Sequence, residues 1–591
     1  MSTNLPISGF EKQIVTAVEN NLVTIIKAET GAGKSTQVPQ FLLKAKGLSK
    51  IVVTQPRRIA ATSVAQRVAE ELGCELGGLV GYRTAIERKD SNKTRLLFCT
   101  DGLELVSELF GGDVPEGALV IDEAHEWNLN IELLIAWARY QLEQGARYRV
   151  VIMSATLDTK RLIEHFDGKA VLIEVPGRTF PIAEKKRERP MVEEVSALLK
   201  EGRNVLVFQP GKVEISKTVS ALINMDVDAE VFPLHAETPL MDQVPCFLTY
   251  WRPKCVVATN VAQTSITIPD IDAVVDSGLE RRSEYIDGVE GLYIRPISLA
   301  DSSQRKGRAG RVKPGIYIDY CPTDAERRVE FPKADILSLP LEKVILQLAK
   351  AGVQIENIRF CNQPSAERIK EARNVLFALG CTDRKGNLTA IGTIVASLPI
   401  SARLGRMIVE GARRNVLSET ILLASVMEQG GVIRERRASK DKTSTWSDAF
   451  AELAAFVKGH NLSPEQFEEH GIDLGAFTEA QILGRRLQKT LRHSIDITSF
   501  RVSSEKDVVC SIYAGLIDRL YRRGLVKGYK DSAGNMRNLP TGSVVNGAEQ
   551  VVGLPLNLQV RSEFGPKTLR LITMATRVDD ELFSQVVQGR V

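Results

Sequence analysis

The alternation of short apolar runs with amphipathic stretches is the feature that most constrains the fold of this chain. Each run is rich in β-branched residues and is followed by residues with the periodicity of a helix. The runs in the first part of the chain are Val23–Lys27, Ile51–Thr54, Leu96–Cys99, Ala118–Ile121 and Val150–Met153. Strands that are apolar along their whole length are buried on both faces, so the pattern predicts a parallel sheet covered by helices. Ligands of such sheets bind at the carboxyl ends of the strands.

The same alternation restarts after the segment Val175–Arg178. Its runs are Val205–Phe208, Val231–Leu234, Val256–Thr259, Ala273–Val275 and Gly315–Tyr320. The repetition predicts an α/β fold with two tandem lobes of similar build, over residues 1–175 and 176–325.

Long helical patterns replace the alternation beyond residue 325. They cover Leu341–Ala351, Ala366–Leu379, Arg403–Arg414 and Ser418–Met427. Four short strand-like runs follow near the end, at Gly542–Asn546, Val551–Leu554, Leu556–Arg561 and Leu569–Ala575. Because a typical domain has about 150 residues, a chain of 591 residues contains several. We therefore expect a helical accessory region followed by a small barrel or sheet.

Composition narrows the class of protein. With 43% hydrophobic and 25% charged residues, the chain has enough apolar content for several folded cores. The net charge is only +4, so any basic surface for nucleic acid has to be local. The eight cysteines form no C-x-x-C pair and the six histidines show no ligand spacing, which argues for reduced thiols and against structural zinc.

The sequence contains no recognisable targeting or membrane segment. Its start, MSTNLPISGF, has no basic region followed by an apolar run, and no apolar stretch of about 18 residues occurs. We therefore expect a cytoplasmic protein without membrane association, and a monomer.

A glycine-rich segment, Ala28–Thr36, follows the first apolar run and has the sequence AETGAGKST. It matches the phosphate-loop pattern G-x-x-x-x-G-K-[ST], except that Ala28 stands at the first glycine position. In such a loop, backbone N–H groups and a helix N-terminus bind phosphates, and the lysine neutralises β- and γ-phosphate charge. The residues expected to bind nucleotide are Glu29, Thr30, Gly31, Ala32, Gly33, Lys34, Ser35 and Thr36. A glycine-rich turn without nucleotide is the alternative.

A pair of carboxylates, Asp122 and Glu123, follows the run Ala118–Ile121. Asp122 and Ser35 are expected to supply oxygen ligands for Mg²⁺, and Glu123 to orient or deprotonate the attacking water. The pair argues against a turn without nucleotide and predicts a triphosphatase that uses ATP and Mg²⁺. A lone histidine is more often structural than functional, but the position of His125, two residues after the pair, favours a role in the reaction.

A second cluster, Gln304–Arg311, lies in the predicted second lobe and has the sequence QRKGRAGR. Its arginines are spaced three apart and share one face if the segment is helical. A solvated basic helix is the ordinary interpretation of such a run. A triphosphatase with its phosphate loop in one lobe needs positive charge from the other. We therefore expect Arg308 and Arg311 to act as arginine fingers, with Gln304 toward the γ-phosphate or water.

The ordered set of motifs resembles the DEAH-box helicases of superfamily 2 and is most similar to the bacterial HrpA/HrpB type of RNA helicase. The motifs are AETGAGKST (28–36), TQPRRIAA (54–61), TDG (100–102), DEAH (122–125), SAT (154–156), LVF (206–208), ATNVAQTSITIP (258–269) and QRKGRAGR (304–311). The resemblance implies two RecA-like lobes, a winged helix over 326–392, a helical ratchet bundle over 393–498 and an OB-like barrel over 499–591.

The resemblance also implies roles for residues outside the phosphate site. Ser154 and Thr156 would couple hydrolysis to lobe movement. The residues expected to contact the nucleic-acid backbone are Arg57, Arg58, Thr100 and Thr264. Backbone contacts imply sequence-independent binding that weakens as salt rises.

The base of the nucleotide would be held loosely between Arg67 and Phe247, with little preference among ATP, GTP, CTP and UTP. The alternatives are a helix-surface charge for Arg67 and a core position for Phe247. A hairpin is predicted over Arg282–Pro296, where Tyr285 and Tyr293 are candidates to stack on bases.

Two substitutions depart from the family pattern. Ala28 replaces a glycine, and Gln263 replaces an acidic residue. Alanine fits a loop position that needs no positive φ, and glutamine keeps its hydrogen bonds while losing charge. Activity is still expected, with reduced coupling as the alternative. The long C-terminal extensions of bacterial relatives are not seen, which leads us to expect a minimal helicase.

The function implied by the resemblance is that of an ATP-dependent RNA helicase. It would hydrolyse ATP with Mg²⁺, move 3′-to-5′ on single-stranded RNA, and unwind tailed duplexes or remodel RNA–protein complexes. A protein activator is a further candidate partner. A DNA helicase or translocase and a nucleotide-binding scaffold without unwinding activity are the alternatives.

Overall fold

The computed structural model describes residues 5–29, 31–111, 117–177, 180–235, 238, 240–263, 268–286, 289–311, 313–434, 444–524, 528–562 and 565–588. The chain divides into two compact units. Unit 1 consists of Met1–Arg282, Ile294–Ser338 and Ile358–Gln363, and unit 2 of Ser283–Tyr293, Leu339–Asn357 and Pro364–Val591. Both predicted α/β lobes therefore lie in unit 1.

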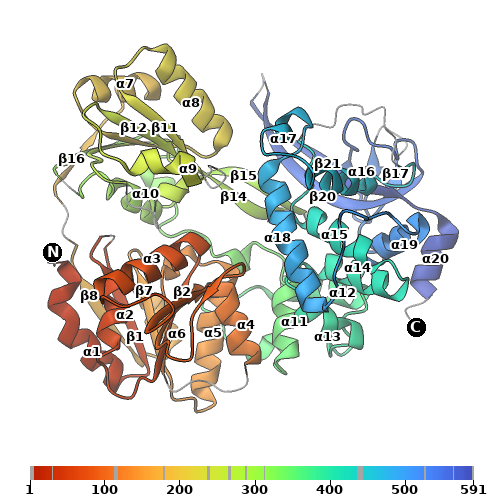
Figure 1. The fold of residues 1–591 in the computed structure, drawn as a ribbon, viewed down its shortest axis with the longest axis horizontal. Helices are drawn as coiled ribbons and strands as arrows, with labels where there is room; N and C mark the ends of the chain where they lie inside the picture. The colour runs from red at the N-terminus through yellow and green to blue at the C-terminus, as the bar shows by residue number, and fades with distance from the viewer. Residues whose placement is uncertain are drawn as a thin grey trace. The chain divides into compact units, whose positions relative to one another are not determined.

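An eight-stranded sheet forms the core of the first lobe, drawn in red to orange in Figure 1. In spatial order its strands are β4 (Arg88–Lys89), β3 (Val80–Arg83), β5 (Leu96–Thr100), β2 (Lys50–Gln55), β6 (Gly117–Ile121), β7 (Arg149–Ser154), β1 (Val23–Ala28) and β8 (Ala170–Val175). All neighbours are parallel except β3 and β4. The five predicted runs are confirmed as β1, β2, β5, β6 and β7. The remaining strands lie toward the edges, where exposed residues interrupt the apolar pattern.

Helices cover this sheet. They are α1 (Glu11–Asn20), α2 (Lys34–Leu42), α3 (Arg58–Glu71), α4 (Asp101–Phe110), α5 (Leu129–Glu143) and α6 (Thr159–His165), with 3₁₀ turns η1 (Pro6–Phe10) and η2 (Ala124–Glu126). On one face, Ile14 of α1, Val38 of α2 and Val68 of α3 pack with Ile26 and Val53 of the strands in one buried cluster. This packing fixes the start of α2, where the phosphate loop ends.

The second lobe has a six-stranded sheet in which every pairing is parallel. Its order is β11 (Glu230–Leu234), β12 (Lys254–Ala258), β10 (Val205–Phe208), β13 (Ala273–Asp276), β16 (Gly315–Asp319) and β9 (Ile182–Lys185). Val205 and Val207 lie in one apolar cluster and Leu206 and Phe208 in another, so β10 is buried on both faces. The five predicted runs of this lobe are confirmed. β9 escaped prediction because three of its four residues are exposed.

The helical elements of the second lobe and its connector complete unit 1. They are α7 (Met191–Lys200), α8 (Lys212–Asn224), α9 (Leu240–Gln243), η3 (Val244–Phe247), η4 (Asn260–Ala262), α10 (Leu299–Lys306), η5 (Ala325–Arg327) and η6 (Asp335–Leu337). α10 begins with a capping box between Ser298 and Asp301. This cap orients the helix that carries Gln304.

The predicted hairpin is confirmed as β14 (Leu279–Ile286) and β15 (Val289–Pro296), although its Asp287-Gly288 turn lies outside the described residues. Within unit 2, Asn557 Nδ2 donates to the Tyr293 hydroxyl over 2.9 Å, and Arg519 Nη2 donates to the Tyr285 hydroxyl over 3.2 Å. Tyr293 is only 5% exposed, so its ring is not available for base stacking in this conformation. Stacking by Tyr285 stays a prediction.

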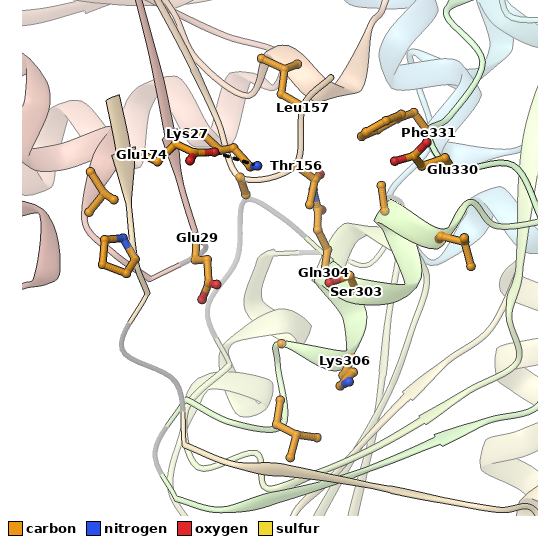
Figure 2. Close-up of a pocket in the computed structure, with 17 residues that line it drawn as sticks. Lys27, Glu29, Thr156, Leu157, Glu174, Ser303, Gln304, Lys306, Glu330 and Phe331 are labelled. Carbon is orange, nitrogen blue, oxygen red and sulfur yellow. Dashed lines mark hydrogen bonds and ion pairs between the residues drawn. The ribbon is translucent and has the colours of Figure 1, made fainter. Parts of the chain in front are cut away.

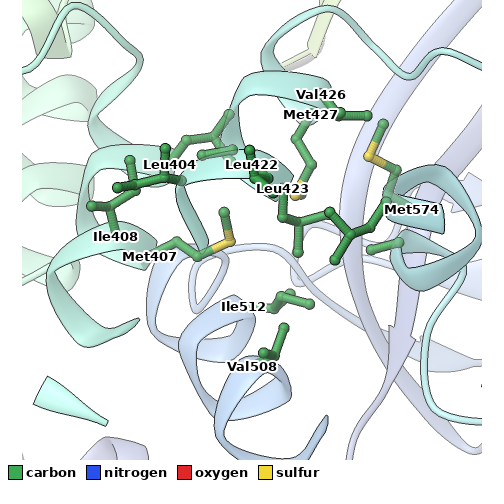
Figure 3. Packing of buried hydrophobic residues seen from close by; sticks show 14 of the residues in the cluster. Leu404, Met407, Ile408, Leu422, Leu423, Val426, Met427, Val508, Ile512 and Met574 are labelled. Atoms are coloured by element: carbon green, nitrogen blue, oxygen red, sulfur yellow. The ribbon is translucent and has the colours of Figure 1, made fainter. Parts of the chain in front are cut away.

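Unit 2 is helical in its first part and rich in strands in its last. Its helices are α11 (Glu342–Lys350), η7 (Ile355–Asn357), α12 (Ala366–Ala378), α13 (Ala390–Ser397), α14 (Ala402–Arg413), α15 (Leu417–Glu428), α16 (Ala449–Gly459), α17 (Gln466–Glu469), α18 (Leu474–Leu491), α19 (Glu505–Gly515) and α20 (Asp580–Gln588). Met407 of α14, Leu423 of α15 and Ile512 of α19 meet Met574 in one buried cluster (Figure 3). The helical patterns predicted beyond residue 325 are thereby confirmed.

The strands of unit 2 are β17 (Leu520–Arg523), β18 (Tyr529–Lys530), β19 (Met536–Arg537), β20 (Gln550–Ser562) and β21 (Gly565–Arg577). The two runs predicted from Val551 to Arg561 form one strand, β20, with a bulge between Val552 and Leu554. The prediction of a strand at Gly542–Asn546 is wrong. The Asp448 carboxylate accepts hydrogen bonds from Val544 N and from the Ser543 hydroxyl, which holds this segment in turns.

Unit 1 extends beyond the predicted end of the second lobe at residue 325. Residues 326–338 and 358–363 group with the lobes, whereas the winged helix was predicted over 326–392. The division into five domains stays a prediction. Within the described part of the chain, no single helix is long and apolar enough to cross a membrane; α13 and α14, bent by 117° from each other, meet the length and composition criteria only as a pair.

Candidate nucleotide-hydrolysis site

The phosphate loop connects β1 to α2. Gly31 has a φ of 88° and Gly33 a φ of 94°, which residues with a Cβ rarely adopt. A Cβ on Gly33 would also lie 2.8 Å from Leu5 Cδ1. Ala28 is different, because it ends β1 in register with Val175 and has no positive φ. Alanine at position 28 is therefore compatible with the loop, as expected from the sequence. Thr30, also predicted to bind nucleotide, lies outside the described residues.

The lysine of the loop is paired with the second carboxylate of the first lobe. Lys34 Nζ donates a hydrogen bond to Glu123 Oε1 over 3.1 Å, and their side chains are 6% and 8% exposed. Burial alone would raise the pKa of Glu123, but Lys34, His125 and Arg308 outweigh it and lower that pKa. Glu123 is therefore ionised at neutral pH and suited to accept a hydrogen bond or a proton from water.

The first carboxylate is held at the end of β6. Asp122 Oδ2 accepts from Gln55 Nε2 over 2.8 Å, its Oδ1 accepts from Glu123 N over 2.8 Å, and the Ser35 side chain also hydrogen-bonds to it. Burial and the neighbouring Glu123 charge raise the pKa of Asp122 to about 6. Glu123 has a φ of 53°, which is strained for glutamate. Backbone strain of this kind is common at functional sites.

The side-chain oxygen atoms of Asp122 and Ser35 fit the ligand preferences of Mg²⁺. That ion is usually held by one or two carboxylates together with phosphate oxygens and water, rather than by a cage of side chains. Asp122 and Ser35 supply a carboxylate and a hydroxyl that lie in hydrogen-bond contact. Among the residues that the structure describes, no group of three or more His, Cys, Asp and Glu side chains could hold a metal by itself.

A chain of polar contacts leads from the carboxylates to the second lobe. His125 Nδ1 lies 3.0 Å from Ser154 Oγ, which donates to the carbonyl of Thr156 over 3.1 Å. Gln304 Nε2 donates to Thr156 Oγ1 across the lobes. Burial lowers the pKa of His125, against the opposing influence of Glu123, so its ring is neutral at pH 7. The predicted coupling residues are thus brought together with Gln304.

The second-lobe arginines face the same carboxylate. Arg308 is 3% exposed, and its guanidinium donates to the carbonyl of Gln263. Burial lowers the pKa of Arg311 to about 10, and burial together with the neighbouring Arg311 lowers the pKa of Arg308, while Glu123 raises both. A guanidinium is not deprotonated in proteins, so both side chains carry a positive charge. Their electrostatic influence on Glu123 agrees with the role of arginine fingers.

A cavity of about 870 Å³ lies beside this contact, lined by both lobes of unit 1 (Figure 2). Glu29, Thr156 and Gln304 line it, together with the ion pair between Lys27 and Glu174. Lys34, Ser35 and Asp122 are not among the described residues that line it. The cavity therefore adjoins the phosphate site on the side of the Thr156–Gln304 contact.

Comparison with known proteins decides the family. The family described as "DEAD/DEAH box helicase" matches residues 10–164, and the "Helicase conserved C-terminal domain" matches residues 190–313. The chain belongs to the DEAD/DEAH box helicases. This assignment confirms the resemblance that the ordered motifs predicted, and the two RecA-like lobes with it.

Individual relatives support the assignment. The ATP-dependent RNA helicase HrpA of Escherichia coli strain K12 is 35% identical over 497 residues, which cover 78% of this chain and 38% of the relative. The probable ATP-dependent RNA helicase DHR2 of Saccharomyces cerevisiae is 33% identical over 481 residues, covering 74% and 65%. The crystal structure of the E. coli DExH-box NTPase HrpB matches with a TM-score of 0.79 and 27% identity, over 100% of this chain and 70% of that one. The chain thus spans less than two thirds of the length of the curated relatives.

Three of the residues predicted to contact nucleic acid lie at strand ends of the first lobe. Arg57 and Arg58 lie at the start of α3 after β2, and Thr100 is the last residue of β5, directly before α4. Arg57 Nη2 also lies 3.4 Å from Glu126 Oε1, which ties it to the segment carrying the carboxylates. Thr264 lies outside the described residues. The contacts with nucleic acid stay predictions.

Two groups of residues escaped the sequence reasoning. Asp101 Oδ2 accepts from Asn128 Nδ2 over 2.7 Å, linking the segment after Thr100 to the segment after the carboxylates. In the second lobe, a pocket of about 210 Å³ opens at the carboxyl ends of β10, β11 and β12. Its polar lining residues are Gln209, Lys212, His235, Thr259, Asn260, Glu280 and Arg281. The position of Gln209, His235 and Thr259 just after strand ends was the available signal, but the pocket draws on four separate segments of the sequence.

Arg67 and Phe247, the residues predicted to hold the base, lie in separate lobes. The Arg67 side chain is 60% exposed on α3 and pairs with Glu71 over 2.7 Å. Phe247 ends η3 and packs partly buried against the core of the second lobe. Both positions match the alternatives of a surface charge and a core residue, and base binding stays a prediction.

Proposed function

We propose that this chain is an ATP-dependent RNA helicase. The observation that carries the proposal is the buried group of Lys34, Asp122 and Glu123 in one lobe, with Arg308 of the other lobe close enough to lower the pKa of Glu123. This set matches the requirements of phosphoryl transfer to water: a cation for the phosphates, ligands for Mg²⁺, a base and arginine fingers.

In the proposed reaction, the phosphates lie on the loop before α2, where backbone N–H groups and Lys34 bind them. Ser35 and Asp122 would hold Mg²⁺, which neutralises phosphate charge when bound. Glu123 orients the attacking water and takes up its proton. Arg308 and Arg311 stabilise the charge that develops on the transferred group. Because these arginines belong to the second lobe, hydrolysis requires the lobes to be closed.

Coupling to movement would pass through the contact between Thr156 and Gln304. Ser154 joins this contact to His125, which lies two residues after the carboxylates. When the γ-phosphate leaves, Gln304 and the arginines lose their partner across the cleft, and the lobes separate. Repeated closing and opening of the lobes would move the chain along its strand.

RNA is the proposed substrate, bound by its backbone at the strand ends of both lobes. Arg57, Arg58 and Thr100 would contribute in the first lobe, and Thr264 in the second. The polar pocket of the second lobe adds two cationic side chains, Lys212 and Arg281, although Glu280 also lines it. The relatives HrpA and DHR2 are named ATP-dependent RNA helicases, which supports RNA over DNA.

The finer points of the proposal follow family resemblance. They are movement in the 3′-to-5′ direction, unwinding of duplexes with a single-stranded tail, acceptance of other nucleotides in place of ATP, stimulation by a protein activator, a monomeric state and a cytoplasmic location. Mg²⁺ as the cofactor is supported by the oxygen donors of Asp122 and Ser35.

The deciding experiment is steady-state hydrolysis of ATP with no nucleic acid, with single-stranded RNA and with single-stranded DNA of the same sequence. Glu123→Gln serves as the blank. We expect strong stimulation by RNA and little by DNA. Duplexes with a 3′ or a 5′ tail then test direction, and only the 3′-tailed duplex should be unwound.

Two outcomes would redirect the proposal. Equal stimulation by DNA would favour a DNA helicase or translocase. Hydrolysis no greater than that of the blank under all conditions, with ATP still bound, would favour a nucleotide-binding scaffold.

A further inference from the structure

A buried polar network lies around Gln263 in the second lobe, beside the arginine fingers. The Gln263 side chain is 5% exposed. Its amide nitrogen donates to Asp301 Oδ1 over 2.7 Å and lies 3.4 Å from Gln304 Oε1. Its amide oxygen accepts from Arg305 Nε over 3.0 Å. Every polar atom of this amide therefore has a partner.

The chemistry of the neighbours fixes the orientation of the amide. A guanidinium such as that of Arg305 only donates hydrogen bonds, and an ionised carboxylate such as that of Asp301 only accepts them. The oxygen of Gln263 must therefore face Arg305 and its nitrogen must face Asp301. A reversed amide would lose both contacts in a buried site, where unpaired polar groups are costly.

The same residue holds one arginine finger through its backbone. The carbonyl oxygen of Gln263 accepts hydrogen bonds from Arg308 Nε, at 3.1 Å, and from Arg308 Nη2. The position of this carbonyl is set by the side-chain contacts of Gln263 with Asp301 and Arg305. The guanidinium of Arg308 is thus indirectly tied to the Gln263–Asp301 hydrogen bond.

The charges around Gln263 explain why an amide occurs at this position. Asp301 is 8% exposed and caps α10 through Ser298, while Arg305 donates to Asp276 Oδ1 over 2.8 Å. A glutamate at 263 would bring its carboxylate against that of Asp301, and two carboxylates in such contact cannot both ionise. The site therefore accommodates one carboxylate and one amide, not two carboxylates.

We infer that Gln263 and Asp301 form a positioning pair for Arg308, in which Asp301 carries the negative charge that the family pattern puts at position 263. The inference rests on the proposed function, because it concerns the same hydrolysis site. It goes further in one respect: the amide and the carboxylate should be exchangeable between the two positions. Gln263 is then no sign of weakened coupling.

The test is a cycle of three variants of the full chain: Gln263→Glu, Asp301→Asn, and the double variant that exchanges the two groups. Three quantities are measured: kcat for ATP hydrolysis with saturating single-stranded RNA, the Kd values of ADP and of ADP with aluminium fluoride, and the unfolding temperature. The fluoride complex mimics the phosphoryl group in transfer, to which arginine fingers bind.

Gln263→Glu is expected to lower kcat and to weaken binding of the fluoride complex by about tenfold each, with the ADP affinity unchanged, because arginine fingers act on charge that develops in the transition state. Asp301→Asn keeps a hydrogen bond but removes the charge, and should give a smaller loss. The double variant should return to within about threefold of the wild type, because coupled neighbours are not additive.

Two results would overturn the inference. One is a double variant whose loss equals the product of the single losses. The other is a fall in ADP affinity that matches the fall for the fluoride complex, since this would indicate general damage to the fold. If Gln263→Glu does not fold, a folded double variant supports the pair and an unfolded one overturns it. If the wild type does not hydrolyse ATP, the proposed function fails. The pair is then tested by the unfolding temperatures: changes that add up in the double variant would overturn it, and a double variant restored toward the wild type would support it.

Discussion

The Lys34 ammonium donates a hydrogen bond to Glu123 Oε1 over 3.1 Å, and both side chains are less than a tenth exposed. The cation expected to bind phosphate is thus paired with the carboxylate expected to act on water. A buried charge left without a partner is costly. Bound phosphates must therefore take Lys34 away from Glu123, and this exchange frees the carboxylate for water when the nucleotide is present.

Replacing Glu123 with glutamine should separate binding from hydrolysis. An amide cannot take a proton from water, so kcat should fall by about 100-fold or more. Removal of the negative charge beside the phosphates should leave the Kd for ATP unchanged or lower. Steady-state hydrolysis and equilibrium binding of a fluorescent ATP analogue measure the two effects. Glu174→Gln, at an exposed carboxylate paired with Lys27, is the matched control and should behave as the wild type.

A variant that retains a tenth of the wild-type kcat would contradict the assignment of Glu123 as the base. A large rise in the Kd for ATP would contradict the competition for Lys34.

Replacing Lys34 with methionine should destabilise the first lobe through the carboxylate that it leaves behind. Breaking a buried ion pair by removing one partner costs about 3–5 kcal/mol. In the Glu123→Gln background the same substitution leaves no unpaired charge at position 123 and should cost less. The free energies of unfolding of the two single variants and the double variant measure the difference. Equal costs of Lys34→Met in both backgrounds would mean that the pair contributes nothing to stability.

Replacing Ser154 with alanine should weaken coupling more than hydrolysis. The substitution removes the contact with His125 Nδ1 and the hydrogen bond to the Thr156 carbonyl. Ser154 and Thr156 are assigned to coupling and not to phosphate binding, so RNA-stimulated hydrolysis should stay within about threefold of the wild type. Unwinding should fall by about tenfold, because the conformational step is then uncoupled from hydrolysis. The number of ATP molecules hydrolysed per duplex unwound is the quantity to compare. A parallel loss of both activities would make Ser154 part of the hydrolysis site.

The lobes could be predicted from sequence because their central strands are apolar on both faces. β10 illustrates this, since Val205 and Phe208 belong to apolar clusters on opposite faces of the sheet. Edge strands have one exposed side and no such pattern, which is why β8 and β9 were not predicted. The run at Gly542–Asn546 was misread because its backbone is bound by Asp448, almost a hundred positions earlier in the chain.

The hydrolysis site could be predicted because its residues lie in short motifs at strand ends. The contacts between motifs could not. The pairing of Lys34 with Glu123 needs the register of parallel strands, and the role of Gln263 depends on Asp301, Arg305 and Arg308 of another segment. Gln263 departs from the family pattern in the sequence, but in the structure every polar atom of its side-chain amide has a hydrogen-bond partner.

Glu132 of α5 should make the stability of the first lobe depend on pH. It is buried and accepts hydrogen bonds from Asn362 N over 2.8 Å and from Asn362 Nδ2 over 2.7 Å. Burial, only partly opposed by these bonds, raises its pKa to about 7 from 4.5. The folded state therefore binds the proton more tightly than the unfolded chain. The resulting stabilisation is complete below pH 4.5 and is lost as the pH rises through 7.

A Glu132→Gln variant cannot titrate and isolates this contribution. Between pH 4.5 and 7.5 the wild type should lose about 3 kcal/mol of stability relative to the variant, the equivalent of the shift in pKa. Hydrogen-exchange protection of the α5 amides, corrected for the intrinsic rate at each pH, measures the local free energy of opening. Glu164→Gln, at an exposed carboxylate of α6 on the same lobe, is the control and should leave the pH dependence of α5 unchanged. If the free energy of opening varies with pH in the same way in the wild type and in Glu132→Gln, Glu132 is ionised across the whole range. Its hydrogen bonds to Asn362, and not its burial, would then set its pKa.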